Sequence, residues 1–458
     1  MRFGFPGDLP DYHAYEALQI FFSADKMPEF VPGEASTWLE YNGKRYVIPE
    51  FSSHKELERH IYKLVGSLTG LSSPWGCLTG VRPTKIVNTL FASGLDRDQV
   101  LGELTGFYLA DRDKAELALK TAELQRPFLD LQMREPERIG VYIGIPFCPT
   151  RCVYCSFTSN SIEKYRKSLD KYMELMYAEM ADCAMLIKER GLKVESVYLG
   201  GGTPTSLPEP LFEEYIRNVV SCFIDPSPEL REFAVEAGRP DSITSGKLDI
   251  CKSAGVTRIS VNPQTMNDET LKLIGRHHTS EQTLKAFELS RKCGFDNINM
   301  DIIAGLPGET PEMFEHTLDQ IEALGPESVT VHTLSVKRAA ELRWDNERRG
   351  LLSPEYAGTM VSSAASRLTA RGMRPYYMYR QKNMLGNHEN AAYCVPGKES
   401  PYNIHIMEED QTILACGAGG VSKRVYGGNI LRAFNVKSVE EYLARSGEMA
   451  ERKRKLFE

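Results

Sequence analysis

Three cysteines stand close together in the run Cys148-Pro149-Thr150-Arg151-Cys152-Val153-Tyr154-Cys155. Three thiolates on one short loop can hold three irons of a cubane cluster and leave the fourth iron open to a further ligand. Zinc usually takes four nitrogen or sulfur ligands, commonly from two separated pairs, and the sequence has no second C-x-x-C or H-x-x-x-H pair. The spacing therefore predicts a 4Fe-4S cluster on Cys148, Cys152 and Cys155.

A glycine-rich run, Gly200-Gly201-Gly202-Thr203-Pro204-Thr205, follows the apolar segment 194–199. Glycines remove side chains, so a ligand can approach the backbone closely. A tight turn between a strand and a helix is the structural alternative. An amino acid bound to an open iron needs acceptors for its ammonium group, and carbonyls and a hydroxyl at Gly201, Gly202 and Thr203 could supply them.

Polar residues stand at or after the ends of further predicted strands, namely Glu236, Gln264 and Asp301, with Arg276 on the segment after the fourth strand. A carboxylate suits a ribose hydroxyl or a substrate amine, and the bidentate fork of an arginine suits a carboxylate. Each residue alone fits a structural polar group almost as well. These residues come from successive strand–helix units whose strands end on the same side of the predicted sheet. They are therefore predicted to bind ligands together.

Other residues of metal-binding type are expected to have ordinary roles. The adjacent residues His277 and His278 would point about 100° apart on a helix and could not easily share one ion. The remaining seven cysteines are scattered singly and are expected to be mostly small buried apolar side chains.

Short β-rich runs alternate with longer helical stretches from about residue 139, as in a parallel sheet of βα units. Six such units favour a partial (β/α)6 barrel within the α/β class over a flat doubly wound sheet. In both folds, ligands sit at the carboxyl ends of the strands. The strands are predicted at Ile139–Ile145, Val194–Leu199, Phe233–Ala237, Arg258–Asn262, Ile298–Ile303 and Val329–Leu334.

The barrel is predicted to occupy residues 138–338, between an N-terminal α+β domain of residues 1–137 and a C-terminal domain of residues 339–458. A hairpin is expected around Asn42-Gly43. The net charge of −7 argues against nucleic acid as a partner, and no apolar run is long enough for a membrane span. Ten cysteines diluted over 458 residues and a start without signal-peptide character predict a reducing compartment, the cytoplasm.

With the cysteine loop and the Gly-Gly-Gly-Thr-Pro-Thr turn, the chain resembles the radical S-adenosylmethionine (SAM) superfamily. Within it, the chain is similar to the oxygen-independent coproporphyrinogen dehydrogenases, in their HemZ branch. The resemblance covers most of the chain and rests on Ile143–Thr150, Trp75–Lys85, Val235–Asp241, Ile274–Thr279, Gly305–Gly308 and Tyr379–Asn383.

The resemblance implies a radical-SAM barrel in which the three cysteines bind the cluster and the open iron binds SAM. Tyr142 would lie near the sulfonium and Tyr154 near the cofactor, while Glu236 would contact the first SAM. The residues that match contacts to a second SAM molecule are Gln264, Arg276 and Asp301. Ser335 and Val421 match the remaining contacts, and Tyr142 and Arg276 are the candidate catalytic side chains.

The implied reaction is oxygen-independent oxidative decarboxylation of coproporphyrinogen propionates to vinyl groups, with an electron donor that reduces the cluster. Two residue patterns depart from the family. The dehydrogenases have a further cysteine where this chain has Phe157, as the related heme chaperones do. The His-Asn-x-x-Tyr-Trp heme motif of the chaperones is Glu389-Asn390-Ala391-Ala392-Tyr393-Cys394 here. A heme-binding chaperone and a radical enzyme with another substrate are therefore the alternatives.

Overall fold

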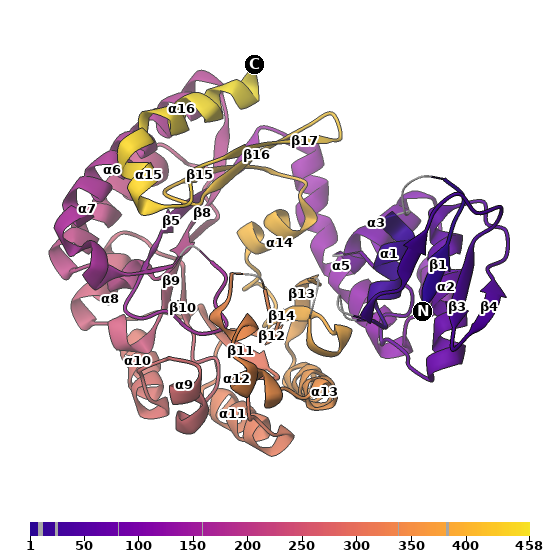
Figure 1. Cartoon of the computed structure of the whole chain (residues 1–458). Coiled ribbons are helices and arrows are strands. Elements are labelled where there is room, and N and C mark those ends of the chain that lie inside the picture. Colours follow the sequence, from indigo (N-terminus) through magenta and orange to yellow (C-terminus); the bar gives the residue numbers. More distant parts are fainter. Residues whose placement is uncertain (8–11, 23–25, 81, 158, 338, 382–383) are drawn as a thin grey trace. The chain divides into compact units, whose positions relative to one another are not determined.

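The computed structural model describes residues 1–7, 12–22, 26–80, 82–157, 159–337, 339–381 and 384–458. The described chain divides into two compact units (Figure 1). Met1–Ala122 and parts of the segment 380–388 form the first unit, and most of the chain from Glu123 onward forms the second. The expected three-part division at residues 137 and 338 stays a prediction, and Arg338 itself lies outside the described residues.

The first unit is built around a four-stranded sheet in the order β2-β1-β3-β4. Asn42 and Gly43 connect β3 to β4 with φ values of 51° and 77°, as a two-residue hairpin turn of type I′ requires. Apolar side chains of the sheet and of two helices form one core. The elements are β1 (Arg2–Gly4), α1 (Tyr12–Gln19), β2 (Glu29–Val31), β3 (Trp38–Tyr41), β4 (Lys44–Val47), α2 (His54–Thr69), α3 (Pro83–Ala92) and α4 (Arg97–Gly106).

The second unit contains the predicted α/β partial barrel. Six strands lie side by side in chain order and pair in parallel, and helices cover their outer side (Figure 1). The strands are β5 (Arg138–Ile145), β8 (Lys193–Gly201), β9 (Glu232–Gly238), β10 (Arg258–Val261), β11 (Ile298–Ala304) and β12 (Ser328–Thr333). The helices of this part are α6 (Leu169–Glu189), α7 (Glu209–Val219), α8 (Ser245–Ser253), α9 (Asp268–Leu273), α10 (Ser280–Lys292) and α11 (Pro311–Leu324).

Residues after the sixth strand extend the same sheet at both of its edges. At one edge, β14 pairs antiparallel with β12, and β13 pairs antiparallel with β14. At the other edge, β15 pairs in parallel with β5, β16 pairs antiparallel with β15, and β17 pairs antiparallel with β16. Within the described residues, no helix is long and apolar enough to span a bilayer. The elements are α5 (Arg112–Arg134), which precedes β5, and α12 (Asn346–Gly350), α13 (Pro354–Ala370), β13 (Arg374–Tyr379), β14 (Asn390–Cys394), α14 (Pro401–Glu408), β15 (Thr412–Cys416), β16 (Val421–Tyr426), β17 (Asn429–Phe434), α15 (Val439–Arg445) and α16 (Gly447–Arg454).

A buried ion pair joins the C-terminal helix α16 to α6 of the barrel. Glu179 of α6 pairs with Lys453 of α16, and both side chains are almost fully buried. The Glu179 carboxylate also accepts a hydrogen bond from the Gly417 amide at 2.9 Å and one from Asn435 Nδ2 at 2.7 Å. Since a Cβ at Gly417 would lie 2.2 Å from the Gly144 carbonyl oxygen, the turn after β15 packs directly on β5.

Candidate functional site

The cysteine loop follows β5 between two short strands, β6 (Phe147–Cys148) and β7 (Asn160–Ser161). Backbone hydrogen bonds fix both of its sides. The Gly202 amide donates to the Ile145 carbonyl at 2.7 Å, and the Val153 amide donates to the Ile274 carbonyl at 3.1 Å. The loop is thus held at the carboxyl ends of the parallel strands, where the sequence predicted a ligand site.

The three thiols of this loop are free and half-buried. Thr203 Oγ1 donates to Cys148 Sγ at 3.5 Å, and Arg239 Nη1 lies 3.9 Å from Cys152 Sγ as a donor. Burial raises the pKa of Cys148 to about 11, whereas the hydrogen bond from Thr203 and the charge of Arg239 oppose this effect. Three soft donors on one loop, two of them with such partners, fit a 4Fe-4S cluster with one open iron.

The glycine turn packs against the cysteine loop. A Cβ at Gly202 would lie 2.9 Å from Cys148 Sγ and 2.4 Å from the Phe147 carbonyl oxygen. Gly201 has a φ of 105°, a conformation that favours glycine. A Cβ at Gly200 would lie 2.8 Å from Glu236 Oε2. The glycines therefore serve the close packing of the protein itself as well as the predicted approach of a ligand.

Tyr142 belongs to a stack of three tyrosines. Its ring centroid lies 6.4 Å from that of Tyr198 on β8 and 6.2 Å from that of Tyr402 on α14, and the last two rings are 4.5 Å apart. Tyr198 donates its hydroxyl proton to Glu236 Oε1 at 2.7 Å. The stack joins the predicted residues Tyr142 and Glu236 through two tyrosines that the sequence did not single out.

The two predicted carboxylates, Glu236 and Asp301, differ in their electrostatics. Burial raises the pKa of Glu236 to about 7, the charge of Asp301 adds to this effect, and the hydrogen bond from Tyr198 opposes it. Burial also raises the pKa of Asp301, but contact with His332 at 3.8 Å and a hydrogen bond from Asn299 at 2.7 Å bring it below the usual value. At pH 7, Glu236 is therefore divided between its protonated and ionised forms, whereas Asp301 is ionised.

Gln264 lies beside Asp301 and has a φ of 71°, which is unusual for a residue with a side chain. Its amide donates to the Asp301 carbonyl at 2.9 Å, and its own carbonyl accepts from the Ile303 amide at 2.9 Å. These two hydrogen bonds form an isolated β-bridge. The segment that follows β10 therefore stays paired with β11 beyond the end of β10. Gln264, beyond the end of β10, is therefore held beside Asp301, which lies in the middle of β11 and not at its end as predicted.

Arg276 is buried and holds the cysteine loop to the strand ends. Nη1 donates to the Tyr154 hydroxyl at 3.2 Å, and Nη2 donates to the Asn262 carbonyl at 2.8 Å and to the Gly238 carbonyl at 3.2 Å. Its Nε has no hydrogen-bond partner among the described residues. The predicted role of Arg276 as a partner of a ligand carboxylate stays a prediction.

Arg239 and His278 were not predicted as site residues. Arg239 forms two hydrogen bonds to Asp241, at 3.0 and 2.9 Å, and reaches Thr150 Oγ1 at 3.1 Å on the cysteine loop. Burial lowers the pKa of His278 to about 3, and the charges of Arg276 and Arg239 lower it further, so the ring is neutral. The sequence could have indicated Arg239 as a site residue, because it stands in the run Gly238-Arg239-Pro240-Asp241 directly after a predicted strand.

Ser335 and Val421 lie farther along the chain. Ser335 follows β12, is half-buried and forms an isolated bridge with Met384. Val421 begins β16, pairs with Phe434 and is 39% exposed. Nothing in these contacts joins them to the cysteine loop, so their predicted cofactor contacts stay predictions. In the run Tyr379–Asn383, Lys382 and Asn383 lie outside the described residues.

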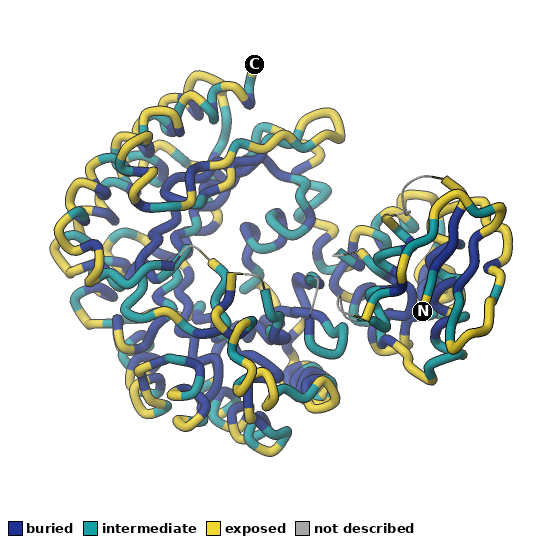
Figure 2. The backbone as a smooth tube through the Cα atoms, in the orientation of Figure 1, coloured by how far each residue is buried: buried dark blue, intermediate teal, exposed yellow. Residues whose placement is uncertain are grey.

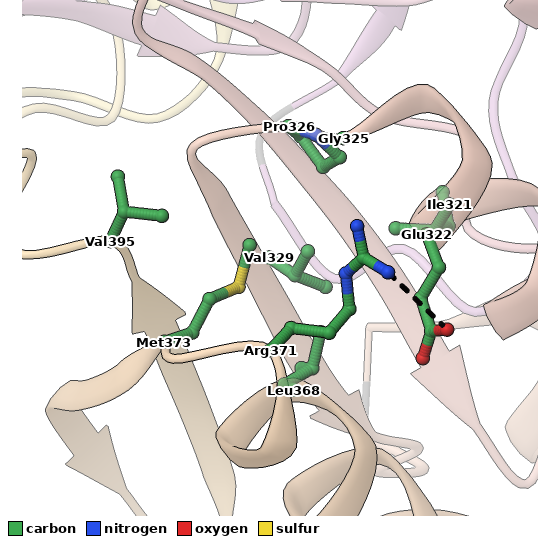
Figure 3. Close-up of a pocket in the computed structure, with 9 residues that line it drawn as sticks. All are labelled: Ile321, Glu322, Gly325, Pro326, Val329, Leu368, Arg371, Met373 and Val395. Atoms are coloured by element: carbon green, nitrogen blue, oxygen red, sulfur yellow. Dashed lines mark ion pairs between the residues drawn. The ribbon is translucent and has the colours of Figure 1, made fainter.

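A separate pocket lies away from these residues (Figure 3). Val329, near the amino end of β12, and Arg371, just after α13, face it. An ion pair of 3.9 Å joins Arg371 to Glu322 on α11. None of the candidate ligand residues lines this pocket, which is at the opposite end of β12 from the carboxyl ends of the strands.

Comparison with known proteins finds similarity to radical SAM proteins and to proteins named for coproporphyrinogen or heme. A model of the Radical SAM superfamily matches residues 142–321. The "Oxygen-independent coproporphyrinogen-III oxidase-like protein HemZ" of Bacillus subtilis (strain 168) is 40% identical over 411 residues, which cover 89% of this chain and 82% of that protein. The "Heme chaperone HemW" of the same organism is 32% identical over 306 residues, which cover 66% of this chain and 75% of that protein.

A solved structure supports the fold. Coproporphyrinogen III oxidase (HemN) from Escherichia coli, described as a radical SAM enzyme, matches with a TM-score of 0.56 and 24% sequence identity. The match covers 71% of this chain and 73% of that chain. The predicted α/β partial barrel of radical-SAM type is thereby confirmed.

Proposed function

Because the chain belongs to the oxygen-independent coproporphyrinogen-III oxidase-like proteins of the radical SAM superfamily, we propose that it decarboxylates the propionate side chains of coproporphyrinogen III to vinyl groups. The radical SAM domain implies a 4Fe-4S cluster and SAM. When bound, the cluster and SAM would supply the radical chemistry that removes one hydrogen atom from the propionate. Loss of carbon dioxide then leaves one electron over, so the proposed reaction also needs a one-electron acceptor. The 40% identity to the HemZ protein over 89% of the chain is the observation that carries this proposal.

The residues of the chain bind and orient in this proposal. Cys148, Cys152 and Cys155 would hold the cluster, with Arg239 and Thr203 placing hydrogen-bond donors beside two of the sulfurs. Glu236 would accept a hydrogen bond from the cofactor near the tyrosine stack.

The heme chaperone is the second candidate, supported by the 32% identity to the HemW protein and by Phe157, which is 68% exposed beside the cysteine loop. The segment that corresponds to the chaperone's heme motif argues against it. Asn390 accepts a hydrogen bond from the Thr333 amide at 2.7 Å, and the Glu389 carbonyl accepts one from Thr333 Oγ1 at 2.7 Å. Asn390–Cys394 are buried in β14, and Glu389 stands at the position of the motif's histidine, with His388 one residue earlier.

An anaerobic assay tests the proposal. The full chain, with its cluster reconstituted, is incubated with SAM, a chemical reductant, a one-electron acceptor and coproporphyrinogen III, and the products are separated by mass. We expect loss of one or two molecules of carbon dioxide per porphyrinogen and formation of deoxyadenosine. Tight binding of heme without any vinyl product would favour the chaperone and would overturn the enzyme.

Replacement of Glu236 tests its predicted contact with SAM. Glu236→Gln keeps the size of the side chain but removes the charge, so we expect SAM affinity to fall by about 1.5–3 kcal/mol while the protein stays folded. Since the pKa of Glu236 is about 7, SAM affinity of the unaltered protein should rise as pH increases through 7, and the variant should lose this dependence. Equilibrium binding at pH 6 and pH 8 measures both effects. Unchanged affinity in the variant would return Glu236 to a structural role.

Replacement of Arg276 tests the step after cofactor cleavage. In this proposal the guanidinium of Arg276 pairs with a carboxylate of the substrate or of a second SAM, and lysine cannot reproduce that planar fork. We therefore expect Arg276→Lys to lower decarboxylation at least about tenfold, which corresponds to roughly 1.4 kcal/mol in the barrier, while iron content and uncoupled SAM cleavage remain nearly intact. Iron analysis and separate assays of deoxyadenosine and vinyl product distinguish these effects. Equal loss of all three quantities would show that Arg276 only supports the cysteine loop.

A further inference from the structure

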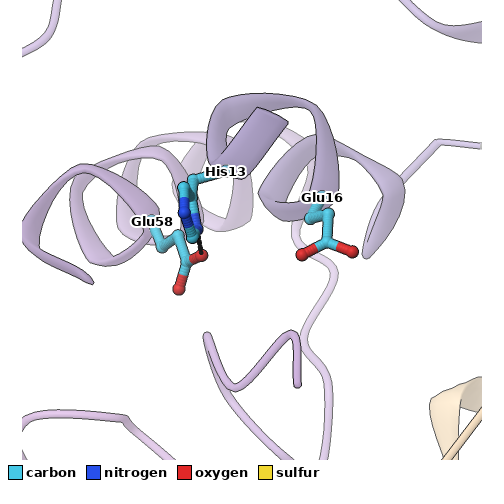
Figure 4. Close-up of side chains that lie close together, drawn as sticks. All are labelled: His13, Glu16 and Glu58. Carbon is cyan, nitrogen blue, oxygen red and sulfur yellow. Dashed lines mark hydrogen bonds and ion pairs between the residues drawn. The ribbon is translucent and has the colours of Figure 1, made fainter. Parts of the chain in front are cut away.

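Three side chains of metal-binding type converge in the first unit, away from the cysteine residues in sequence (Figure 4). His13 and Glu16 stand three residues apart on α1, so both side chains lie on one face of the helix. Glu58 comes from α2, and its Oε1 lies 2.8 Å from His13 Nδ1. One ligand atom from each of the three residues lies within 4.8 Å of the other two.

The surroundings hold these groups in place. Glu58 is only 7% exposed and accepts a further hydrogen bond from Thr79 Oγ1 at 3.2 Å. The imidazole of His54 stacks on that of His13, with ring centroids 4.5 Å apart and planes inclined by 19°. Buried Leu57 and Ile61 of α2 belong to the apolar core behind the site. The imidazole and the buried carboxylate are therefore preorganised.

The carboxylates of Glu16 and Glu58 lie close together, and this arrangement is unfavourable in free energy without a cation. Glu58 is only 7% exposed, and a carboxylate oxygen of Glu16 lies within 4.8 Å of one of its own. A buried carboxylate with a second one nearby favours either protonation or a positive partner. A neutral imidazole uses one ring nitrogen as an acceptor, which is also the atom that coordinates a metal.

We propose that His13, Glu16 and Glu58 bind a divalent transition-metal cation. One imidazole nitrogen and carboxylate oxygens form a mixed set that suits zinc and its neighbours in the first row, whereas magnesium and calcium prefer ligands that are all oxygen. Three protein ligands leave coordination positions open for water or for a small ligand. The site is independent of the cluster, because none of its ligands is a thiol.

A structural alternative makes a different prediction for Glu16. If the group serves only as an ion pair between His13 and Glu58 that joins α1 to α2, Glu16 contributes nothing and no metal binds. If the group is a metal site, Glu16 is a ligand. Glu16 is also half-buried and not fully enclosed, so its replacement leaves the apolar core intact and is the better variant for the test.

The experiment is a calorimetric titration of Zn²⁺ into the full chain with its cluster in place, under nitrogen at pH 7.5. We expect one Zn²⁺ per chain, with iron content unchanged before and after the titration, and at least tenfold weaker binding of Mg²⁺. Glu16→Gln and His13→Gln should each weaken Zn²⁺ binding about tenfold or more. The matched control is Glu312→Gln with His316→Gln, two exposed residues of α11 that should leave binding unchanged.

Several results would overturn the site. Equal Zn²⁺ affinity in the unaltered protein and in folded Glu16→Gln would show that Glu16 is no ligand. Magnesium that binds as tightly as zinc would exclude a transition-metal site. Zinc that displaces iron from the cysteines, with no further ion bound, would assign the binding to the cluster thiols. Far-ultraviolet circular dichroism of each variant shows whether it is folded, and Glu16→Gln decides the outcome if His13→Gln is not.

Discussion

Cys152→Ala should yield a protein that keeps its fold but lacks the normal iron-sulfur spectrum and forms no deoxyadenosine. A cubane cluster with one open iron needs three protein thiolates, and the described loop offers Cys148, Cys152 and Cys155 at the carboxyl end of β5. Cys152 Sγ also faces Arg239 Nη1 at 3.9 Å, so its loss removes a ligand from the part of the loop where a cationic donor stabilises sulfur. Without the third ligand, both the cluster and its reducing chemistry are expected to disappear.

The measurements are iron and sulfide content, the visible absorption spectrum and SAM cleavage in the presence of a reductant. Cys293→Ala is the matched control, because this half-buried cysteine at the end of α10 is far from the loop in sequence and pairs with no other thiol of the described chain. It should retain full iron content and cleavage activity. Normal cleavage in Cys152→Ala would remove the cluster assignment, whereas loss in the control as well would indicate a general folding defect.

The strands of the barrel could be predicted because each is a short apolar run bounded by turn residues. The prediction Ile298–Ile303 corresponds to β11 (Ile298–Ala304), and Val194–Leu199 lies within β8 (Lys193–Gly201). Buried parallel strands have no polar face, so their pattern is nearly continuous and their ends carry the glycines and polar residues. The position of the glycine turn beside the cysteine loop followed from the same rule about carboxyl ends.

The contribution of the C-terminal segment could not be predicted, because it depends on pairing between residues far apart in sequence. β15 pairs in parallel with β5, and β14 pairs antiparallel with β12, although both follow the sixth strand of the barrel. Tyr402 reaches the tyrosine stack from α14, which begins at Pro401. Nothing in the local sequence indicates which edge of a sheet a strand will join.

Lys453→Met should strongly destabilise the second unit, by about 3–5 kcal/mol, because it leaves the Glu179 carboxylate buried without its cation. Burial lowers the pKa of Lys453, but the charge of Glu179 more than offsets this, so the pKa of Lys453 is raised and the lysine is charged at pH 7. Methionine keeps most of the packing of the lysine stem, and the loss therefore reports on charge. Urea unfolding followed by circular dichroism measures the shift in midpoint.

Two further variants separate the charge from other causes of this destabilisation. Lys455→Met removes an exposed lysine that pairs with Glu451 one turn away, and should change stability by less than about 1 kcal/mol. Adding Glu179→Gln to Lys453→Met removes the unpaired charge while keeping an oxygen for the Gly417 amide, so it should recover part of the stability. If the double variant is no more stable than Lys453→Met, the cost lies in packing. If it recovers, the cost of Lys453→Met lies in the buried, unpaired charge of Glu179 beside the turn at Gly417.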